Sequence, residues 1–95
     1  MKKIIAIDVG NSETTVGVGN SDNWESYRYT TRKTITSDEL LMMFRTTIDL
    51  SKADDEILHG AIVCSVVPQI TDSVVSAINK FSSKEEFFWN VTKNN

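Results

Sequence analysis

The stretch IIAIDVGNSETT, residues 4–15, decides the fold of this 95-residue chain. Residues 4–9 form an apolar, largely β-branched run that is interrupted only by Asp8 and ended by Gly10 and Asn11. Such a run is typical of a strand buried on both faces, and therefore of a central strand in a sheet. Residues 14–19 alternate valines with small or polar neighbours, so the stretch predicts two antiparallel strands joined by a tight turn.

A third strand and a helix are predicted next. Residues 24–30 follow a polar turn and predict the strand. Thr36 and Glu39 have the spacing of a capping box, and apolar residues recur behind them at helical intervals. The pattern predicts a helix over residues 37–50, and the polar residues 51–60 predict a loop.

The rest of the chain repeats the order of strand and helix. Residues 61–67 form an apolar run that predicts a buried strand, and Pro68 ends it because proline lacks a backbone donor. Thr71 predicts the cap of a second helix that reaches about Phe81. Residues 87–91 predict a fifth strand.

The predicted order is β-β-β-α-β-α-β, an antiparallel meander followed by two crossover units. Such units join parallel strands with a right-handed connection. The fold class is therefore α/β, with a five-stranded mixed sheet and helices, in the layout of a ribonuclease-H-like or actin-like ATPase half-domain. No linker or internal repeat divides residues 1–95, so we expect a single domain.

Composition excludes several classes of partner. The net charge is −3 and no basic stripe is present, which argues against nucleic acid and anionic membranes as partners. The apolar residues 4–7 are too few for a signal peptide or a bilayer span. Cys64 is the only cysteine, so no intrachain disulfide or cysteine-based zinc site can form. We expect a cytoplasmic protein in which Cys64 is a small core residue.

The turn after the first strand is the candidate site. A carboxylate such as Asp8, at the end of an apolar strand, suits a hydrated Mg²⁺ ion that also binds nucleotide phosphates. Gly10 allows close approach, and further amide and hydroxyl donors to phosphate come from Asn11, Ser12, Thr14 and Thr15. The alternative is an ordinary hairpin in which Asp8 and Asn11 satisfy turn amides. No Gly-Lys-Ser/Thr sequence is present, so this is not a Walker loop.

Other polar residues have weaker claims. Arg28 and Arg32 are candidates to neutralise phosphate or a substrate carboxylate, although surface arginines are commonly solvated. Ser65 and Pro68 lie where open α/β sheets bind ligands, and we expect them to shape the loop. The remaining candidates, which we expect to be structural, are the capping residues Asp38 and Glu39 and His59, placed in a loop.

Three motifs carry a family resemblance. The string AIDVGNSETT (residues 6–15) resembles the first phosphate motif of the acetate and sugar kinase, Hsp70 and actin superfamily. Two further segments narrow the resemblance: RYTT (28–31) followed by TSDEL (36–40), and SVVP (65–68). In this order and spacing they are similar to the N-terminal domain of type III pantothenate kinase. The match covers essentially all 95 residues.

The resemblance implies ATP-dependent phosphorylation of pantothenate, the first committed step to coenzyme A. It implies a two-domain protomer that forms a homodimer and uses ATP, Mg²⁺ and often a monovalent cation, K⁺ or NH₄⁺. Asp8 matches the metal position and Asn11 a phosphate position of the family. The family's catalytic base lies in a C-terminal domain that matches nothing in residues 1–95, so we expect the chain to be inactive alone.

Two alternatives to this interpretation stay open. One is a non-catalytic binding or regulatory module of the same fold, and the other is a fragment of another kinase of the superfamily. Glu13 bears on the first alternative, because family members commonly carry a neutral residue there, often Asn, and a carboxylate would repel phosphates. Strand alternation sends Glu13 and Thr14 to opposite faces, so we expect Glu13 to point to solvent.

Overall fold

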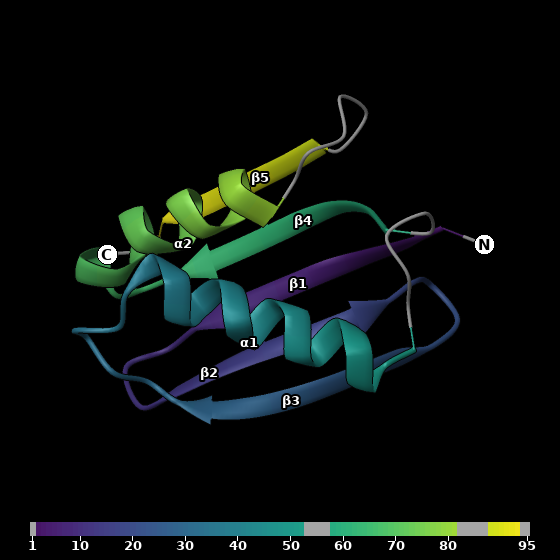
Figure 1. Cartoon of the computed structure of the whole chain (residues 1–95), viewed down its shortest axis with the longest axis horizontal. Coiled ribbons are helices and arrows are strands. Elements are labelled where there is room, and N and C mark those ends of the chain that lie inside the picture. Colours follow the sequence, from purple (N-terminus) through teal and green to yellow (C-terminus); the bar gives the residue numbers. More distant parts are fainter. Residues whose placement is uncertain (1, 53–57, 82–87, 94–95) are drawn as a thin grey trace.

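Strands and helices follow one another in the predicted order β-β-β-α-β-α-β in the computed structural model (Figure 1), which describes residues 2–52, 58–81 and 88–93. Side chains are described throughout these ranges except in the last strand, where that of Thr92 is described. The elements are β1 (Lys3–Val9), β2 (Glu13–Gly19), β3 (Trp24–Thr30), α1 (Ser37–Leu50), β4 (Leu58–Ser65), α2 (Pro68–Phe81) and β5 (Phe88–Lys93). The predicted α/β, ribonuclease-H-like class is confirmed.

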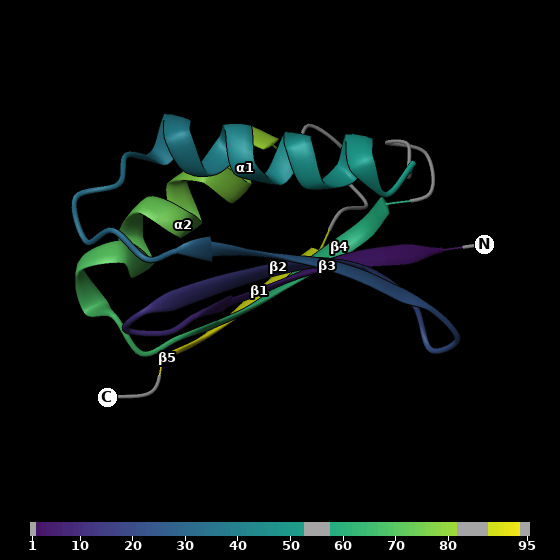
Figure 2. The same ribbon diagram turned by 90° about the horizontal axis from the view of Figure 1, so that it is seen from below.

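The strands form one mixed sheet in the order β3-β2-β1-β4-β5. β2 is antiparallel to both β1 and β3, whereas β4 is parallel to both β1 and β5. Figure 2 shows α1 and α2 on the same side of this sheet. We call the opposite side the uncovered face. No helix within the described ranges is long and apolar enough to cross a membrane.

The core lies between the sheet and the two helices. β1 contributes Ile5, Ile7 and Val9, all nearly fully buried. Most other large buried side chains come from neighbouring strands and from the inner faces of the helices, among them Val16, Val18, Leu40, Phe44, Ile48, Val63, Ile70, Val74 and Ile78. Alternation explains the pattern, because every second residue of a strand points to the helices.

The expectation that residues 4–9 are buried on both faces is wrong. Ile4 and Ala6 are half-buried and Asp8 is exposed, because no described helix covers their side of the sheet. Cys64 is also half-buried on the uncovered face, rather than a core residue as predicted. An apolar run indicates a central strand, but it does not reveal whether both of its faces are covered.

α1 begins where the capping box predicts. The Thr36 hydroxyl accepts from the Glu39 amide at 3.1 Å, and Glu39 Oε1 accepts from the Thr36 amide at 3.1 Å. The helix is also tied to β3, since the Tyr29 hydroxyl lies 3.0 Å from Thr47 Oγ1. The Thr47 hydroxyl donates to the Met43 carbonyl at 2.9 Å, and the Tyr29 hydroxyl lies 3.5 Å from the same carbonyl.

α2 begins four residues earlier than predicted, and Thr71 is not its cap. Pro68 occupies the first helical position, where its missing amide costs nothing and its fixed φ fits the helix. Thr71 is buried, and its hydroxyl lies 3.0 Å from Ser65 Oγ and 3.1 Å from the Val67 carbonyl. Ser65 Oγ also accepts from the Val67 amide at 3.2 Å. These contacts join the end of β4 to the first turn of α2.

Among the strands, β4 and β5 differ most from their predicted bounds. β4 covers Leu58–Ser65, so His59 is in a half-buried strand position and not in a loop. β5 covers Phe88–Lys93, two residues beyond the predicted end, whereas residue 87 lies outside the described residues. Pairing with β4 explains the longer strand, because Cys64 and Ser65 align with Thr92 and Lys93.

Two glycines of β2 allow a direct test of packing between β2 and β3. A Cβ atom on Gly19 would lie 2.6 Å from Cδ2 of Trp24 and closer still to the Asn23 carbonyl oxygen, whereas on Gly17 the nearest atom would be Ser26 Cβ at 3.4 Å. We expect Gly19→Ala to destabilise the protein by about 1–3 kcal/mol through overpacking. Gly17→Ala is the matched control and should change stability much less. Urea denaturation of both variants makes the comparison, and equal midpoints would contradict it.

Candidate functional site

The candidate site is the two-residue turn between β1 and β2. The Gly10 amide donates to the Glu13 carbonyl at 2.9 Å, and Asn11 and Ser12 between them are exposed. A Cβ atom on Gly10 would lie 3.0 Å from that carbonyl oxygen, so the turn is tight enough to favour glycine. Of the non-glycine residues that the structure describes, Lys52 alone has a positive φ, so this turn lacks the left-handed residues of the favoured hairpin turns.

A polar row crosses the uncovered face beside this turn. Sheet register aligns Arg28 of β3 with Thr15 of β2, Thr15 with Asp8 of β1, and Asp8 with Cys64 of β4. Asp8 and Arg28 are exposed, and Thr15 and Cys64 are half-buried. Because paired residues share a face, the four side chains lie in sequence across the sheet. The predicted candidates Asp8, Thr15 and Arg28 are therefore brought together.

Asp8 also borders an open depression in the uncovered face. The depression has a volume of about 490 Å³, and its other walls include Ala6, Trp24, Ile62 and Cys64. Trp24 and Ile62 are large apolar residues that remain nearly half exposed. The carboxylate therefore stands between an exposed polar turn on one side and an apolar hollow on the other.

Thr14 is separated from the other candidates. It points to the helix side of β2 and is 4% exposed, and its hydroxyl lies 2.9 Å from that of Thr31. The Thr31 hydroxyl donates to the Gly10 carbonyl at 2.7 Å, and the Thr31 amide donates to the Ser12 carbonyl at 2.9 Å. Sequence reasoning placed Thr31 in a family motif but did not connect it with the turn.

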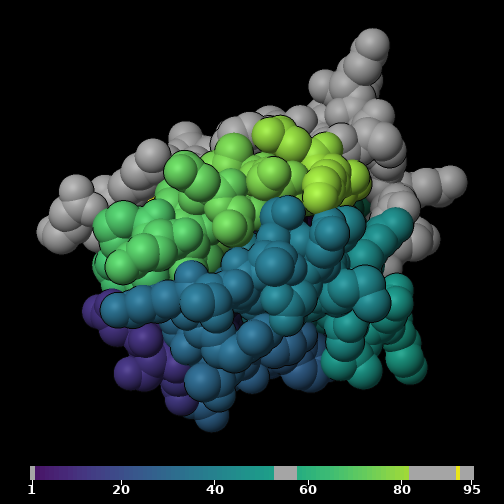
Figure 3. Space-filling model, turned by 60° about the vertical axis from the view of Figure 1, so that its left-hand side comes forward, coloured from purple at the N-terminus to yellow at the C-terminus, as the bar shows by residue number. Residues whose placement is uncertain are grey.

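Three chain segments lie together at the end of the molecule that carries the β1–β2 turn. Figure 3 shows the β1–β2 turn (purple), the loop after β3 (blue) and the start of α2 (green) side by side on the surface. Ser65 is buried, and its hydroxyl is engaged with Val67 and Thr71. Pro68 is exposed at the first position of α2. The contacts of Ser65 favour its predicted loop-shaping role, and for both Ser65 and Pro68 that role stays a prediction.

Glu13 points away from the buried side of β2, as alternation predicts. Its carboxylate lies 3.9 Å from the Arg28 guanidinium, and both side chains are more than half exposed. An ion pair of this length and exposure contributes little to stability. The guanidinium nevertheless offsets part of the negative charge that Glu13 places near the turn.

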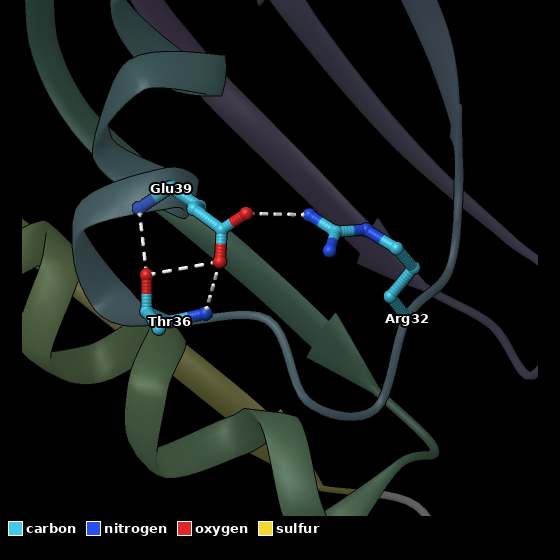
Figure 4. A network of polar contacts seen from close by, with 3 residues as sticks. All are labelled: Arg32, Thr36 and Glu39. Atoms are coloured by element: carbon cyan, nitrogen blue, oxygen red, sulfur yellow. Dashed lines mark hydrogen bonds and ion pairs between the residues drawn. The ribbon is translucent and has the colours of Figure 1, made fainter.

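A second ion pair holds the loop after β3 against α1 (Figure 4). Arg32 donates to Glu39 Oε2 at 2.8 Å, while Glu39 Oε1 accepts from the Thr36 amide and hydroxyl at 3.1 Å each. The bond from Arg32, followed by those from Thr36, lowers the pKa of Glu39 from 4.5 to about 2. Arg32 and Glu39 are thus engaged with each other, which supports a structural role for both.

This ion pair predicts a specific acid sensitivity. The pKa of Glu39 is depressed in the folded state, so its contribution to stability is complete above about pH 4.5 and is lost as the pH falls towards 2. Glu39→Gln keeps the size of the side chain and removes the charge. We expect the difference in melting temperature between wild type and variant to shrink from pH 6 to pH 2.5. A pH-independent difference would contradict the assignment.

The donor set at the turn fits a hydrated Mg²⁺ ion better than a metal bound by protein alone. Within residues 2–52, 58–81 and 88–93 the structure gathers no group of three or more His, Cys, Asp or Glu side chains. Mg²⁺ commonly keeps several waters and binds one or two carboxylates together with phosphate oxygens. Asp8 supplies one exposed carboxylate next to exposed turn residues, which suits such an ion.

Comparison with known families assigns the chain. The family model described as type III pantothenate kinase matches residues 4–94. The chain belongs to the type III pantothenate kinase family. The family resemblance stated from the sequence motifs is therefore confirmed, and the match favours this family over other kinases of the superfamily.

Individual relatives agree with this assignment. The type III pantothenate kinase of Agathobacter rectalis is 39% identical over 79 residues, which cover 82% of this chain and 30% of the relative. The corresponding kinase of Legionella pneumophila strain Corby is 36% identical over 84 residues, 88% of this chain and 33% of the relative. The chain therefore spans about a third of the length of the curated relatives that it matches.

A solved structure supports the fold. YeaZ from Pseudomonas aeruginosa superimposes with a TM-score of 0.74 at 10% sequence identity, and the match covers 99% of this chain and 45% of YeaZ. At this identity the likeness concerns the fold alone.

Proposed function

We propose that residues 1–95 form the metal- and phosphate-positioning domain of an ATP-dependent pantothenate kinase of coenzyme A biosynthesis. One observation carries the proposal: β1 presents a single exposed carboxylate, that of Asp8, at the entrance to a tight turn with exposed Asn11 and Ser12. The family match over residues 4–94 supplies the reaction class. Under this proposal the chain is the N-terminal, ATPase-like domain of a longer kinase.

The chemistry of the site follows from its donors. Asp8 would hold Mg²⁺ through its carboxylate, and the ion would offset the negative charge of the ATP phosphates. Backbone amides of the turn, with the hydroxyls of Ser12 and Thr15, would bind phosphate oxygens, since successive amides form a concavity suited to anions. Arg28 lies in the same row as Asp8 and Thr15 and would add a positive charge towards phosphate or substrate.

Catalysis also requires a general base, and we assign none to the residues around the turn. Phosphorylation of a hydroxyl needs a base within hydrogen-bonding reach of the proton that leaves. Asp8 is assigned to the metal, and the Glu13 and Glu39 carboxylates lie against Arg28 and Arg32. We therefore expect the base, the pantothenate site and dimer contacts to come from the part of the kinase that lies outside this third of its relatives' length. A cytoplasmic location and a monovalent cation belong to the same proposal.

Titration with Mg·ATP tests the phosphate-positioning role. We expect saturable, magnesium-dependent binding by the 95-residue chain. Asp8→Asn keeps the shape of the side chain and removes the metal's negative ligand, so affinity should fall about tenfold or more, which corresponds to about 1.4 kcal/mol. Asp22→Asn in the exposed turn between β2 and β3 is the matched control and should bind like wild type. Equal affinity of the Asp8 and Asp22 variants would refute the role of Asp8.

A second measurement separates positioning from catalysis. The isolated chain should not phosphorylate pantothenate with Mg·ATP, and turnover by the purified chain would contradict the proposal that the catalytic base lies elsewhere in the kinase. Failure to bind Mg·ATP, even with the remaining part of a family kinase supplied, would favour the alternative of a non-catalytic module. Glu13 is the feature that favours this alternative, because its carboxylate lies next to the turn.

A further inference from the structure

Thr31 makes two contacts with the turn between β1 and β2 and one with β2, although it lies beyond the end of β3. Its amide donates to the Ser12 carbonyl at 2.9 Å, and its hydroxyl donates to the Gly10 carbonyl at 2.7 Å. The third contact is the 2.9 Å approach of the Thr14 and Thr31 hydroxyls. Because the Thr31 hydroxyl has one proton and gives it to Gly10, Thr14 is the donor in this pair.

These bonds replace a contact that the turn would usually make for itself. In a two-residue hairpin the first carbonyl commonly accepts from the amide three residues later. Among the hydrogen bonds of the described residues, the Gly10 carbonyl instead accepts from the Thr31 hydroxyl. Gly10 and Glu13 are joined by the bond from the Gly10 amide to the Glu13 carbonyl. The turn also lacks left-handed residues, so its own backbone matches the twist of the strands poorly. An external support is therefore needed to define its geometry.

The direction of the amides follows from the planarity of the peptide bond. In a trans peptide the carbonyl and the next residue's amide point in opposite directions. Holding the Gly10 carbonyl against Thr31 turns the Asn11 amide away from Thr31. Holding the Ser12 carbonyl turns the Glu13 amide away in the same manner. Two backbone donors, the Asn11 and Glu13 amides, are thus turned away from Thr31 by this one residue.

We propose that Thr31 is a positioning residue for the phosphate-binding turn, and that it acts by orienting the Asn11 and Glu13 amides towards an anion. The proposal rests on the proposed function, since the ligand it serves is the ATP phosphate group. Thr31 does not contact the ligand in this account. It acts through the two carbonyls that it holds, and the buried Thr14 hydroxyl keeps the Thr31 side chain in the required rotamer.

Three variants test the proposal by Mg·ATP titration. Thr31→Val keeps the shape of the side chain and removes the hydroxyl, and we expect about a tenfold loss of affinity, on the scale of one displaced hydrogen-bonding group. Thr31→Ser restores the hydroxyl and should bind within about threefold of wild type. Thr34→Val makes the same substitution at an exposed position of the same loop and should leave affinity unchanged. Wild-type affinity in Thr31→Val, or equal losses in Thr31→Val and Thr31→Ser, would overturn the proposal.

Backbone NMR distinguishes positioning from a general loss of structure. Without ligand, Thr31→Val should shift the amide signals of Asn11 and Glu13, while signals of α2 residues stay in place. Unchanged amide signals would contradict the proposal, as would shifts spread over the whole chain. Absence of Mg·ATP binding by the wild type would refute the proposed function itself. Binding by the wild type that Thr31→Val retains would refute only the role of Thr31.

Discussion

The burial of alternate β1 side chains beneath α1 and α2 is the constraint on which the candidate site depends. Ile5, Ile7 and Val9 fill the core, and the residues between them must face the other way because strand side chains alternate. Asp8 is one of these residues. A shift of β1 by one position would expose the core residues and bury the carboxylate, which is costly on both counts. The position of Asp8 is therefore fixed by the burial of its neighbours in the sequence.

Arginines lie beside the carboxylates near the turn, which reduces the repulsion that a negatively charged chain would exert on a phosphate group. The net charge is −3, yet the Glu39 carboxylate is paired with Arg32 at 2.8 Å and Glu13 lies 3.9 Å from Arg28. Both pairs are exposed to solvent, so each is screened by salt. Asp8 is the acidic residue of this region that the proposal assigns to a metal, and the ion would then reverse the local charge.

Local sequence signals were sufficient to predict the bounds of some helices and strands. α1 was predicted with its observed ends because Thr36 and Glu39 mark its start through their own contacts, which involve residues three apart. The strand over Trp24–Thr30 was also predicted correctly. The start of α2 was missed because Thr71 resembles a cap, whereas its hydroxyl bonds Ser65 and Val67. Proline at the first helical position was the signal that could have corrected it.

Properties that depend on distant contacts were not predictable in the same way. The apolar composition of residues 4–9 identified a central strand, but coverage of one face depends on where two helices pack. The row formed by Asp8, Thr15 and Arg28 needs the register of three strands. The role of Thr31 depends on bonds to Gly10 and Ser12 across the hairpin, and no pattern in a single sequence reports such a pairing. The candidate residues could be chosen from the sequence, whereas their division between two faces could not.

The support that Thr31 gives to the turn has a consequence for the order of folding. The turn, both strands that flank it and its support all lie within the first 31 residues, and these strands pair as an antiparallel meander. By contrast, the parallel pairing of β1 with β4 must wait for the crossover through α1. Short loops close at lower entropic cost and contacts between near neighbours form sooner. We therefore expect the turn and its bonds with Thr31 to form early, before the centre of the sheet is complete, whereas the packing that fixes the face of Asp8 comes later.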